Sequence, residues 1–247
     1  MRILLCGYTG HMGREVRKSA EAAPGCEIVQ GIDPMMPEGE PGCVRSFEEY
    51  SGNADVLIDF SHHSLTGALL DFAEKAGMPV VLATTGQTEE EKARIDAAAK
   101  KIPVFYAANY SLGIATLTDL VKRALALYPD AEVEIVEAHH DRKLDAPSGT
   151  ALALMNTVKE VRPNAEAVTG RSGQGKRRPE EVGIHAIRMG NIVGIHEVII
   201  GTQNESLTLK HEAYSRGVFA DGSLKAAEFI IGKKPGIYNM KDLLSER

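Results

Sequence analysis

One stretch of the chain, EAHHDRKLDAPSGTAL at 137–152, gathers side chains that handle protons and anions. His139 and His140 are adjacent, and histidine exchanges protons near neutral pH. Lys143 can neutralise a carboxylate or donate a proton. A helix-like run follows, and its N-terminus, which favours anions, is expected to present N–H groups and hydroxyls from Ser148, Gly149 and Thr150. The stretch therefore predicts a site for an anionic substrate.

The same residues also have ordinary explanations. Adjacent histidines are often structural or exposed, a serine before a helix is commonly a cap, and HHDRK is compatible with a solvated charged turn. Metal binding is a further alternative, but no third ligand stands at a suitable spacing, so no metal is expected. If the strand continued regularly, the two histidines would point to opposite faces. It must therefore end or bend there for His140 and Lys143 to face one pocket.

A glycine-rich turn, GYTGHMG, follows the first strand-like run and contains Gly7, Gly10 and Gly13. These suit a sharp turn, a phosphate close to the backbone, and close packing of the next helix, respectively. Asp33 ends the second strand about 20 residues later, where an acidic residue bonds the ribose hydroxyls of NAD. A plain strand-to-helix turn is the alternative, because the spacing differs from the commoner GxGxxG. The turn and Asp33 together favour a dinucleotide site.

The N-terminal half alternates between strand-like and helix-like segments. Helices are expected at 65–76 and 89–101, and strands at 2–7, 27–33, 55–60, 79–84 and 102–109. This alternation predicts a parallel sheet covered on both faces, with ligands beyond the carboxyl ends of its strands. Thr84 and Thr85 close the fourth strand and residues 108–111 close the fifth. Both segments are expected to line a nicotinamide pocket, although such residues are also common in turns.

After Asn109 the pattern changes to that of a mixed α+β domain with an open sheet. Helices are expected at 114–128 and 149–161, and strands at 132–140, 184–190, 192–203 and 205–215. A glycine-rich loop covers 169–181. A last helix is expected to start near the cap candidate Asp221, before a short tail at 240–244 that can pack back on the first domain.

Composition indicates an ordinary globular protein. The 247 residues are 43% hydrophobic and 25% charged, and the net charge of -6 argues against nucleic-acid binding, which usually needs a basic patch. The three cysteines show no CxxC spacing, so a disulfide framework is not expected. No apolar run reaches the ~20 residues of a membrane span. A cytoplasmic protein that binds no membrane is therefore expected.

In chain order, GYTGHMG, TTG, EAHHDRKLDAPSGTAL and RMGNIVGIHEV resemble the dihydrodipicolinate reductase (4-hydroxy-tetrahydrodipicolinate reductase) family over nearly the whole chain. The motif EAHHxxKxDAPSGTA is highly specific, whereas the glycine loop alone is not. The resemblance implies a Rossmann-like domain at 1–110 and 218–247 that binds NAD(P)H. It also implies a domain at 111–217 that binds substrate and builds a homotetramer. The implied reaction is reduction of a cyclic dicarboxylate to tetrahydrodipicolinate in lysine and diaminopimelate biosynthesis.

The resemblance also implies roles for individual residues. His139 is the expected proton donor or acceptor, and Lys143 the expected proton donor. Substrate contacts are expected from His140, Lys143, Ser148, Gly149 and Thr150. Cofactor contacts are expected from Gly7, Tyr8, Thr9, Gly10, His11, Met12, Asp33, Ala83, Thr84, Thr85, Ala108, Asn109, Tyr110 and Ser111.

The sequence departs from some members of that family in two places. His11 stands where a basic residue is common, and Asp33-Pro34 replaces an acidic residue followed by arginine. Both changes remove cations near a 2′-phosphate, which favours NADH over NADPH. His11, Arg14 or a residue distant in sequence could still supply charge, so both cofactors stay open.

Two other functions are compatible with the glycine loop. One is another two-domain reductase, such as an amino-acid or sugar dehydrogenase, which would not be expected to carry the histidine and lysine cluster. The other is a regulatory protein that senses the nucleotide without turnover. Oxidation of NADH that depends on a dihydrodipicolinate-type substrate distinguishes both from a reductase of the family above.

Overall fold

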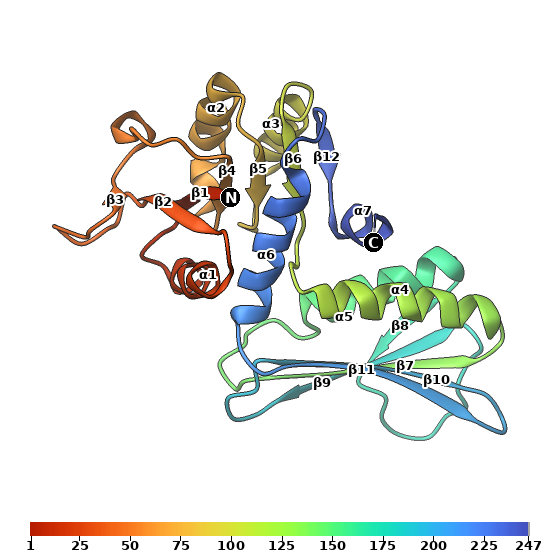
Figure 1. The fold of residues 1–247 in the computed structure, drawn as a ribbon. Helices are drawn as coiled ribbons and strands as arrows, with labels where there is room; N and C mark the ends of the chain where they lie inside the picture. The colour runs from red at the N-terminus through yellow and green to blue at the C-terminus, as the bar shows by residue number, and fades with distance from the viewer. Residues whose placement is uncertain (247) are drawn as a thin grey trace. The chain divides into compact units, whose positions relative to one another are not determined.

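The structure is a computed structural model that describes residues 1–246. The chain forms two compact units (Figure 1). Unit 1 comprises Met1–Leu112 and the chain from Arg216 onward, and unit 2 comprises Gly113–Ser215.

Unit 1 contains a seven-stranded sheet in the order β12-β6-β5-β4-β1-β2-β3, with every pair of neighbours parallel. The chain runs from β1 outward to β2 and β3, then crosses to β4 on the other side of β1. Ligands bind where a parallel sheet changes direction in this way, outside the carboxyl ends of the strands. The strands are β1 (Arg2–Cys6), β2 (Glu27–Ile32), β3 (Cys43–Val44), β4 (Val56–Asp59), β5 (Val80–Leu82), β6 (Pro103–Tyr106) and β12 (Gly236–Tyr238).

Two helix ends in unit 1 follow directly from local chemistry. Thr88 and Glu91 form a capping box at the start of α3. Gly77, in the left-handed region at φ 61°, ends α2. The helices are α1 (His11–Ala22), α2 (Thr66–Ala76), α3 (Glu89–Ala98), α6 (Gly217–Ile230) and α7 (Met240–Ser245), with short 3-10 turns η1 (Phe47–Glu49) and η2 (His63–Leu65).

Unit 2 contains a five-stranded mixed sheet in the order β11-β10-β7-β9-β8. The central strand β7 pairs with β9 in parallel and with β10 in antiparallel orientation. Helices α4 (Leu112–Leu127) and α5 (Gly149–Val161) lie over one face of this sheet (Figure 1). The strands are β7 (Glu132–His139), β8 (Glu166–Thr169), β9 (Glu181–Arg188), β10 (Gly194–Gly201) and β11 (Ser206–Ala213).

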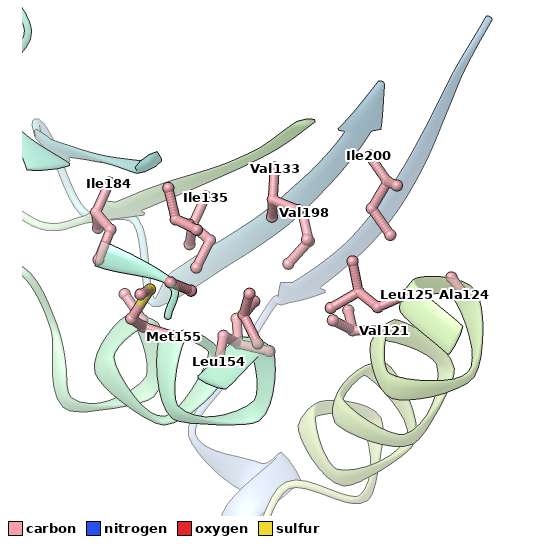
Figure 2. Close-up of a cluster of buried hydrophobic side chains, with 14 of the residues drawn as sticks. Val121, Ala124, Leu125, Val133, Ile135, Leu154, Met155, Ile184, Val198 and Ile200 are labelled. Carbon is pink, nitrogen blue, oxygen red and sulfur yellow. The ribbon is translucent and has the colours of Figure 1, made fainter. Parts of the chain in front are cut away.

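The core of unit 2 lies between this sheet face and the two helices (Figure 2). Val133 and Ile135 of β7 point into it with Leu154 and Met155 of α5. The next residue of β7 on the same face, by the two-residue repeat of a strand, is the fully buried Glu137. The covered face of β7 therefore changes from apolar to polar toward the carboxyl end of the strand.

The fold class expected from the sequence is confirmed: a Rossmann-like parallel sheet accompanies a separate mixed sheet. The cap assigned to Asp221 is wrong, because α6 begins one turn earlier, at Gly217, and buries Ala220 in its first turn. The short strands β3, β8 and β12 were not expected, because each lies at the edge of its sheet and lacks the run of apolar residues that marks β4 or β5. Within residues 1–246, no helix is long and apolar enough to cross a membrane.

Candidate active site

The glycine loop between β1 and α1 is shaped by close backbone approach. Gly7 adopts φ 77°, and a Cβ there would lie 2.4 Å from the carbonyl oxygen of Phe60. A Cβ on Gly13 would lie 2.2 Å from the carbonyl oxygen of Gly7. Gly10 is the N-cap of α1, with no side chain covering the N–H groups of the first turn. These features leave a helix N-terminus suited to a pyrophosphate.

Asp33 follows β2 directly and holds the glycine loop. Its Oδ2 accepts hydrogen bonds from the backbone N–H of Thr9 at 3.0 Å and from the Thr9 hydroxyl at 2.5 Å. Its Oδ1 accepts the N–H of Met35 at 3.0 Å. Asp33, the carboxylate expected to bind the ribose, is thus buried and hydrogen-bonded to the glycine loop, which would bind the pyrophosphate.

A cavity of about 520 Å³ opens beside this loop, within unit 1. It brings together four residues expected to bind the cofactor: Gly7, Thr9, Gly10 and Asp33. Its remaining lining was not expected: Pro34, Met35, Phe60, Ser61, His62, Ser64 and Leu65. Most of these follow β4, whose carboxyl end lies beside that of β1, so the rule that ligands bind at strand ends identifies this segment.

A second cavity of about 200 Å³ shares Phe60, Ser61 and His62 with the first. Its other residues are His63, Ala83, Thr84 and Thr85. The segment after β5 therefore lies at the same edge of the sheet as the glycine loop, where the sequence predicts it.

Other residues expected at the cofactor lie outside these two cavities. The ring of Tyr8 packs on Gly31, where a Cβ would lie 2.2 Å from it. Tyr110 is buried, and its hydroxyl donates to the carbonyl oxygen of Leu82 at 2.8 Å. Both side chains support the sheet, so only their backbones can reach a ligand. His11 and Ala108 are exposed, Met12 and Asn109 are half-buried, and Ser111 is buried.

In unit 2, β7 ends at His139, as the histidine pair requires. Nδ1 of His139 lies 2.6 Å from Oε2 of Glu137, two residues earlier on the same face. Arg188, beside His139 in the register of β9, binds both oxygens of Glu137, at 2.8 and 2.7 Å. Burial raises the pKa of Glu137, but the hydrogen bonds from Arg188, His139 and Ser148 hold it below its ordinary value. Neither Glu137 nor Arg188 was predicted to have a role.

His196 of β10 completes this cluster and was also missed. Its ring lies edge-on to that of His139, with centroids 5.1 Å apart, and its Nε2 lies 3.2 Å from Oγ of Ser148. Burial and the neighbouring His139 lower the pKa of His196 to about 4. The imidazole of His196 is therefore neutral at neutral pH.

Ser148 is the N-cap of α5, and its polar groups bond within the cluster. Its hydroxyl oxygen accepts the N–H of Ala151 at 3.2 Å, and its own N–H donates to Oε1 of Glu137 at 2.9 Å. It is 2% exposed. In this structure, capping and Glu137 therefore use the hydroxyl oxygen and the N–H of Ser148, and its contact with substrate stays a prediction.

Lys143 lies in the loop between β7 and α5, and its Nζ pairs with Oδ1 of Asp145 at 2.7 Å. The ammonium of Lys143 holds the pKa of Asp145 below its ordinary value, and the backbone N–H of Gly149 contributes. A carboxylate of the chain thus contacts both the lysine and the start of α5. Gly149 is exposed, and His140 and Thr150 are half-buried beside these groups in sequence.

The donors that this arrangement offers suit a small anion and a proton rather than a metal. Within the described residues, no group of three His, Cys, Asp or Glu side chains is placed to hold a metal ion. The glycine loop and its cavity fit a dinucleotide, because the backbone passes too close for side chains and the helix N-terminus is uncapped.

Two family models match the chain. One, described as dihydrodipicolinate reductase, N-terminus, matches residues 1–110, and the other, described as dihydrodipicolinate reductase, C-terminus, matches residues 113–244. The 4-hydroxy-tetrahydrodipicolinate reductase of Caldanaerobacter subterraneus subsp. tengcongensis is 45% identical, with 100% of this chain and 99% of that protein aligned. The enzyme of the same name from Clostridium novyi is 42% identical over 100% of this chain and 99% of that protein.

Among solved structures, the dipicolinate-bound dihydrodipicolinate reductase from Paenisporosarcina sp. TG-14 superposes with a TM-score of 0.82. The alignment covers 97% of each chain at 23% identity, which supports the fold alone.

Proposed function

The chain belongs to the dihydrodipicolinate reductase family, and from this premise we propose that it reduces 4-hydroxy-tetrahydrodipicolinate to tetrahydrodipicolinate with NADH or NADPH. This is a step of lysine and diaminopimelate biosynthesis. The observation that carries the proposal is the buried cluster at the end of β7, where Nδ1 of His139 lies against Oε2 of Glu137. Lys143 follows closely in sequence and pairs with Asp145. A plain cap or a solvated turn does not require a buried carboxylate and a buried histidine.

Residues 1–110 and 218–247, which belong to unit 1, are the proposed dinucleotide-binding domain. The residues proposed to hold the cofactor are Gly7 to Met12, Asp33, Ala83 to Thr85 and the backbone of 108–111. Bound there, NAD(P)H supplies the hydride of the reduction. The first turn of α1 receives the pyrophosphate, and Asp33 orients the loop through Thr9.

We propose NADH as the preferred cofactor. Asp33 stands where an acidic residue bonds the ribose hydroxyls of NAD, and no cation that would bind a 2′-phosphate occurs at 34–36. Thr9 and Met35 already donate to this carboxylate. A ribose hydroxyl can donate a further hydrogen bond to this carboxylate, whereas an ionised phosphate has no hydrogen to donate.

Residues 111–217, most of which form unit 2, are the proposed substrate-binding domain. The substrate carries two carboxylates, and the proposed partners are Lys143, His140 and the first residues of α5, Gly149 and Thr150, with Ser148 holding the start of that helix in place. His139 exchanges the one proton that the reduction requires, and Lys143 offers a second proton and a positive charge.

Unit 2 is also proposed to build a homotetramer, through the sheet face that α4 and α5 leave uncovered. Light scattering on the purified protein tests this oligomeric state.

The experiment that tests the function is NAD(P)H oxidation by the purified chain with freshly generated 4-hydroxy-tetrahydrodipicolinate. The proposal predicts turnover that depends on both reactants. A related amino acid, meso-diaminopimelate, with NAD⁺ serves as the control for a dehydrogenase of similar architecture. Turnover of the control without turnover of the dicarboxylate would overturn the proposal.

A further inference from the structure

Glu137 is buried beside His139, and the reaction as proposed leaves it without a role. It is 0% exposed and lies on the same face of β7 as His139. Oε1 accepts from Ser148 N–H and from Nη2 of Arg188, at 2.9 and 2.7 Å. Oε2 accepts from Nη1 of Arg188 at 2.8 Å and lies 2.6 Å from Nδ1 of His139. Each lone pair of this carboxylate thus faces a hydrogen-bond donor, and the ring of His139 is one of these donors.

The charge state of Glu137 determines where the proton of the His139 ring resides. The hydrogen bonds that lower the pKa of Glu137 keep it ionised at neutral pH, and an ionised carboxylate can only accept. The hydrogen between Oε2 and Nδ1 is therefore carried by Nδ1. In the neutral ring this leaves the lone pair on Nε2.

We propose that Glu137 is the positioning residue for His139: it holds a proton on Nδ1, and so makes Nε2 the atom that exchanges a proton with the substrate. This inference rests on the proposed role of His139. When the protonated ring acts as an acid, the Nε2–H bond breaks and the proton goes to the substrate atom that the reduction leaves basic. The ring becomes neutral and keeps Nδ1–H, and a water proton later restores Nε2–H.

The surroundings of Nε2 agree with this assignment. A Cβ on Gly194 would lie 3.3 Å from Nε2 of His139 and 3.7 Å from its Cδ2, so glycine keeps a side chain away from the exchanging atom. On the opposite edge of the ring, the bidentate pair with Arg188 fixes the carboxylate plane and therefore the direction of the bond to Nδ1.

Glu137→Gln tests the proposal, because an amide carries one acceptor and one donor group. Its oxygen is expected at the Oε1 position, where Ser148 and Arg188 both donate. The amide NH₂ then stands at the Oε2 position, facing Nδ1 of His139 and one donor, Nη1 of Arg188. An N–H donor there requires a lone pair on Nδ1, so the neutral ring should move its proton to Nε2. The opposite placement of the amide would face two donors and is disfavoured.

The first readout is the ¹⁵N spectrum of histidine-labelled protein at alkaline pH, with the His139 ring assigned by its loss in His139→Asn. Wild type should carry the proton on Nδ1, and Glu137→Gln on Nε2. A wild-type neutral ring protonated on Nε2 overturns the proposal. This readout needs no activity and no variant of Glu137, so it decides even if Glu137→Gln fails to fold or the reductase function is wrong.

The second readout is steady-state kinetics on the intact protein. Glu137→Gln should lower kcat by about 10²-fold or more, with KM changed far less. The matched control is Glu134→Gln, which removes a carboxylate on the other face of β7 that also binds a histidine, His185 at 2.8 Å, and an arginine, Arg177. The control should keep wild-type kcat. A Glu137→Gln variant that folds, moves the ring proton and retains wild-type kcat overturns the proposal, while the reductase function stands.

Discussion

Oδ1 of Asp145 lies 2.7 Å from Nζ of Lys143, and the same carboxylate bonds the N–H of Gly149 at the start of α5. These are two of the groups proposed to bind a carboxylate of the substrate. Asp145 therefore occupies the place proposed for a substrate carboxylate, and we expect the substrate to displace it. Since Asp145 is exposed, this exchange costs little.

Removing the charge of Asp145 should strengthen binding of a dicarboxylate. An exposed ion pair is worth about 0.2–1 kcal/mol, so Asp145→Asn should lower the Kd for pyridine-2,6-dicarboxylate by up to about fivefold. Calorimetric titration measures this. Asp141→Asn, which loses a pair with Arg142 in the same loop, is the control and should bind as wild type. Weaker binding by Asp145→Asn would mean that Asp145 supports the substrate instead of competing with it.

His139 and Lys143 should differ in how their loss affects the kinetics. His139→Ala removes a proton carrier and should lower kcat by about 10²–10⁴-fold with little change in KM. Lys143→Ala removes both a charge and a proton and should impair kcat and KM together. Initial-rate measurements over a range of substrate concentrations separate the two parameters. Wild-type kinetics in either variant would refute the role of that residue.

Gly194 should be needed for the reaction more than for the fold. Its backbone is an ordinary strand, so Gly194→Ala should change the free energy of unfolding by less than about 1 kcal/mol. The new methyl would crowd Nε2 of His139, and kcat should fall about tenfold or more. Gly201→Ala, at the other end of β10 with no atom within 4 Å of a new Cβ, should affect neither quantity. A Gly194→Ala enzyme with full kcat would show that the space beside Nε2 is not used.

Cofactor preference should depend on Asp33 and on Arg45, a cation whose side chain contacts the next residue, Pro34. Nη1 of Arg45, after β3, donates to the carbonyl oxygen of Pro34 at 3.2 Å. We expect kcat/KM to be higher with NADH than with NADPH. Arg45→Ala should lower kcat/KM for NADPH by a further factor of about five and leave that for NADH unchanged. Lys18→Ala, a cation on α1 that pairs with Glu15, is the control. A clear NADPH preference in wild type would contradict the role given to Asp33.

Stability should fall in mildly acidic solution because of His196. The pKa of His196 is about 4 in the folded protein and ~6.5 in an unfolded chain. Between these values the unfolded state binds a proton that the folded state does not, so the free energy of unfolding decreases as pH falls. The contribution is about 2 kcal/mol between about pH 7 and about pH 5. Urea unfolding of wild type and His196→Asn at both pH values measures it; an equal loss in the two proteins would contradict it.

Much of the fold follows from local patterns in the sequence. Alternation of apolar strands and helices predicts the sheet of unit 1, and the end of β7 at the histidines follows from the chemistry required of them. The start of α6 does not follow, because tertiary packing of Ala220 overrides the preference of Asp221 for a cap position. The edge strands β3 and β12 do not follow either, because neither has the run of apolar residues that marks a central strand such as β5.

The sequence predicts polar residues for the candidate site but not the residues that support them in the structure. Glu137 stands two residues before His139, and the two-residue repeat of a strand places both on one face, a signal that was present in the sequence. Arg188 and His196 lie on other strands, and only strand register brings them to Glu137. Their roles therefore depend on pairings that a single sequence does not reveal.

The reduction itself is tested most directly by following the transferred hydrogen. The purified chain is incubated with freshly generated 4-hydroxy-tetrahydrodipicolinate and NADH that carries deuterium at the transferable position of the nicotinamide. Mass spectrometry should find one deuterium in the tetrahydrodipicolinate product, and the rate of its formation should fall in His139→Ala. Oxidation of the labelled cofactor with no deuterium in the product, or no reaction with the dicarboxylate, would contradict the proposed function.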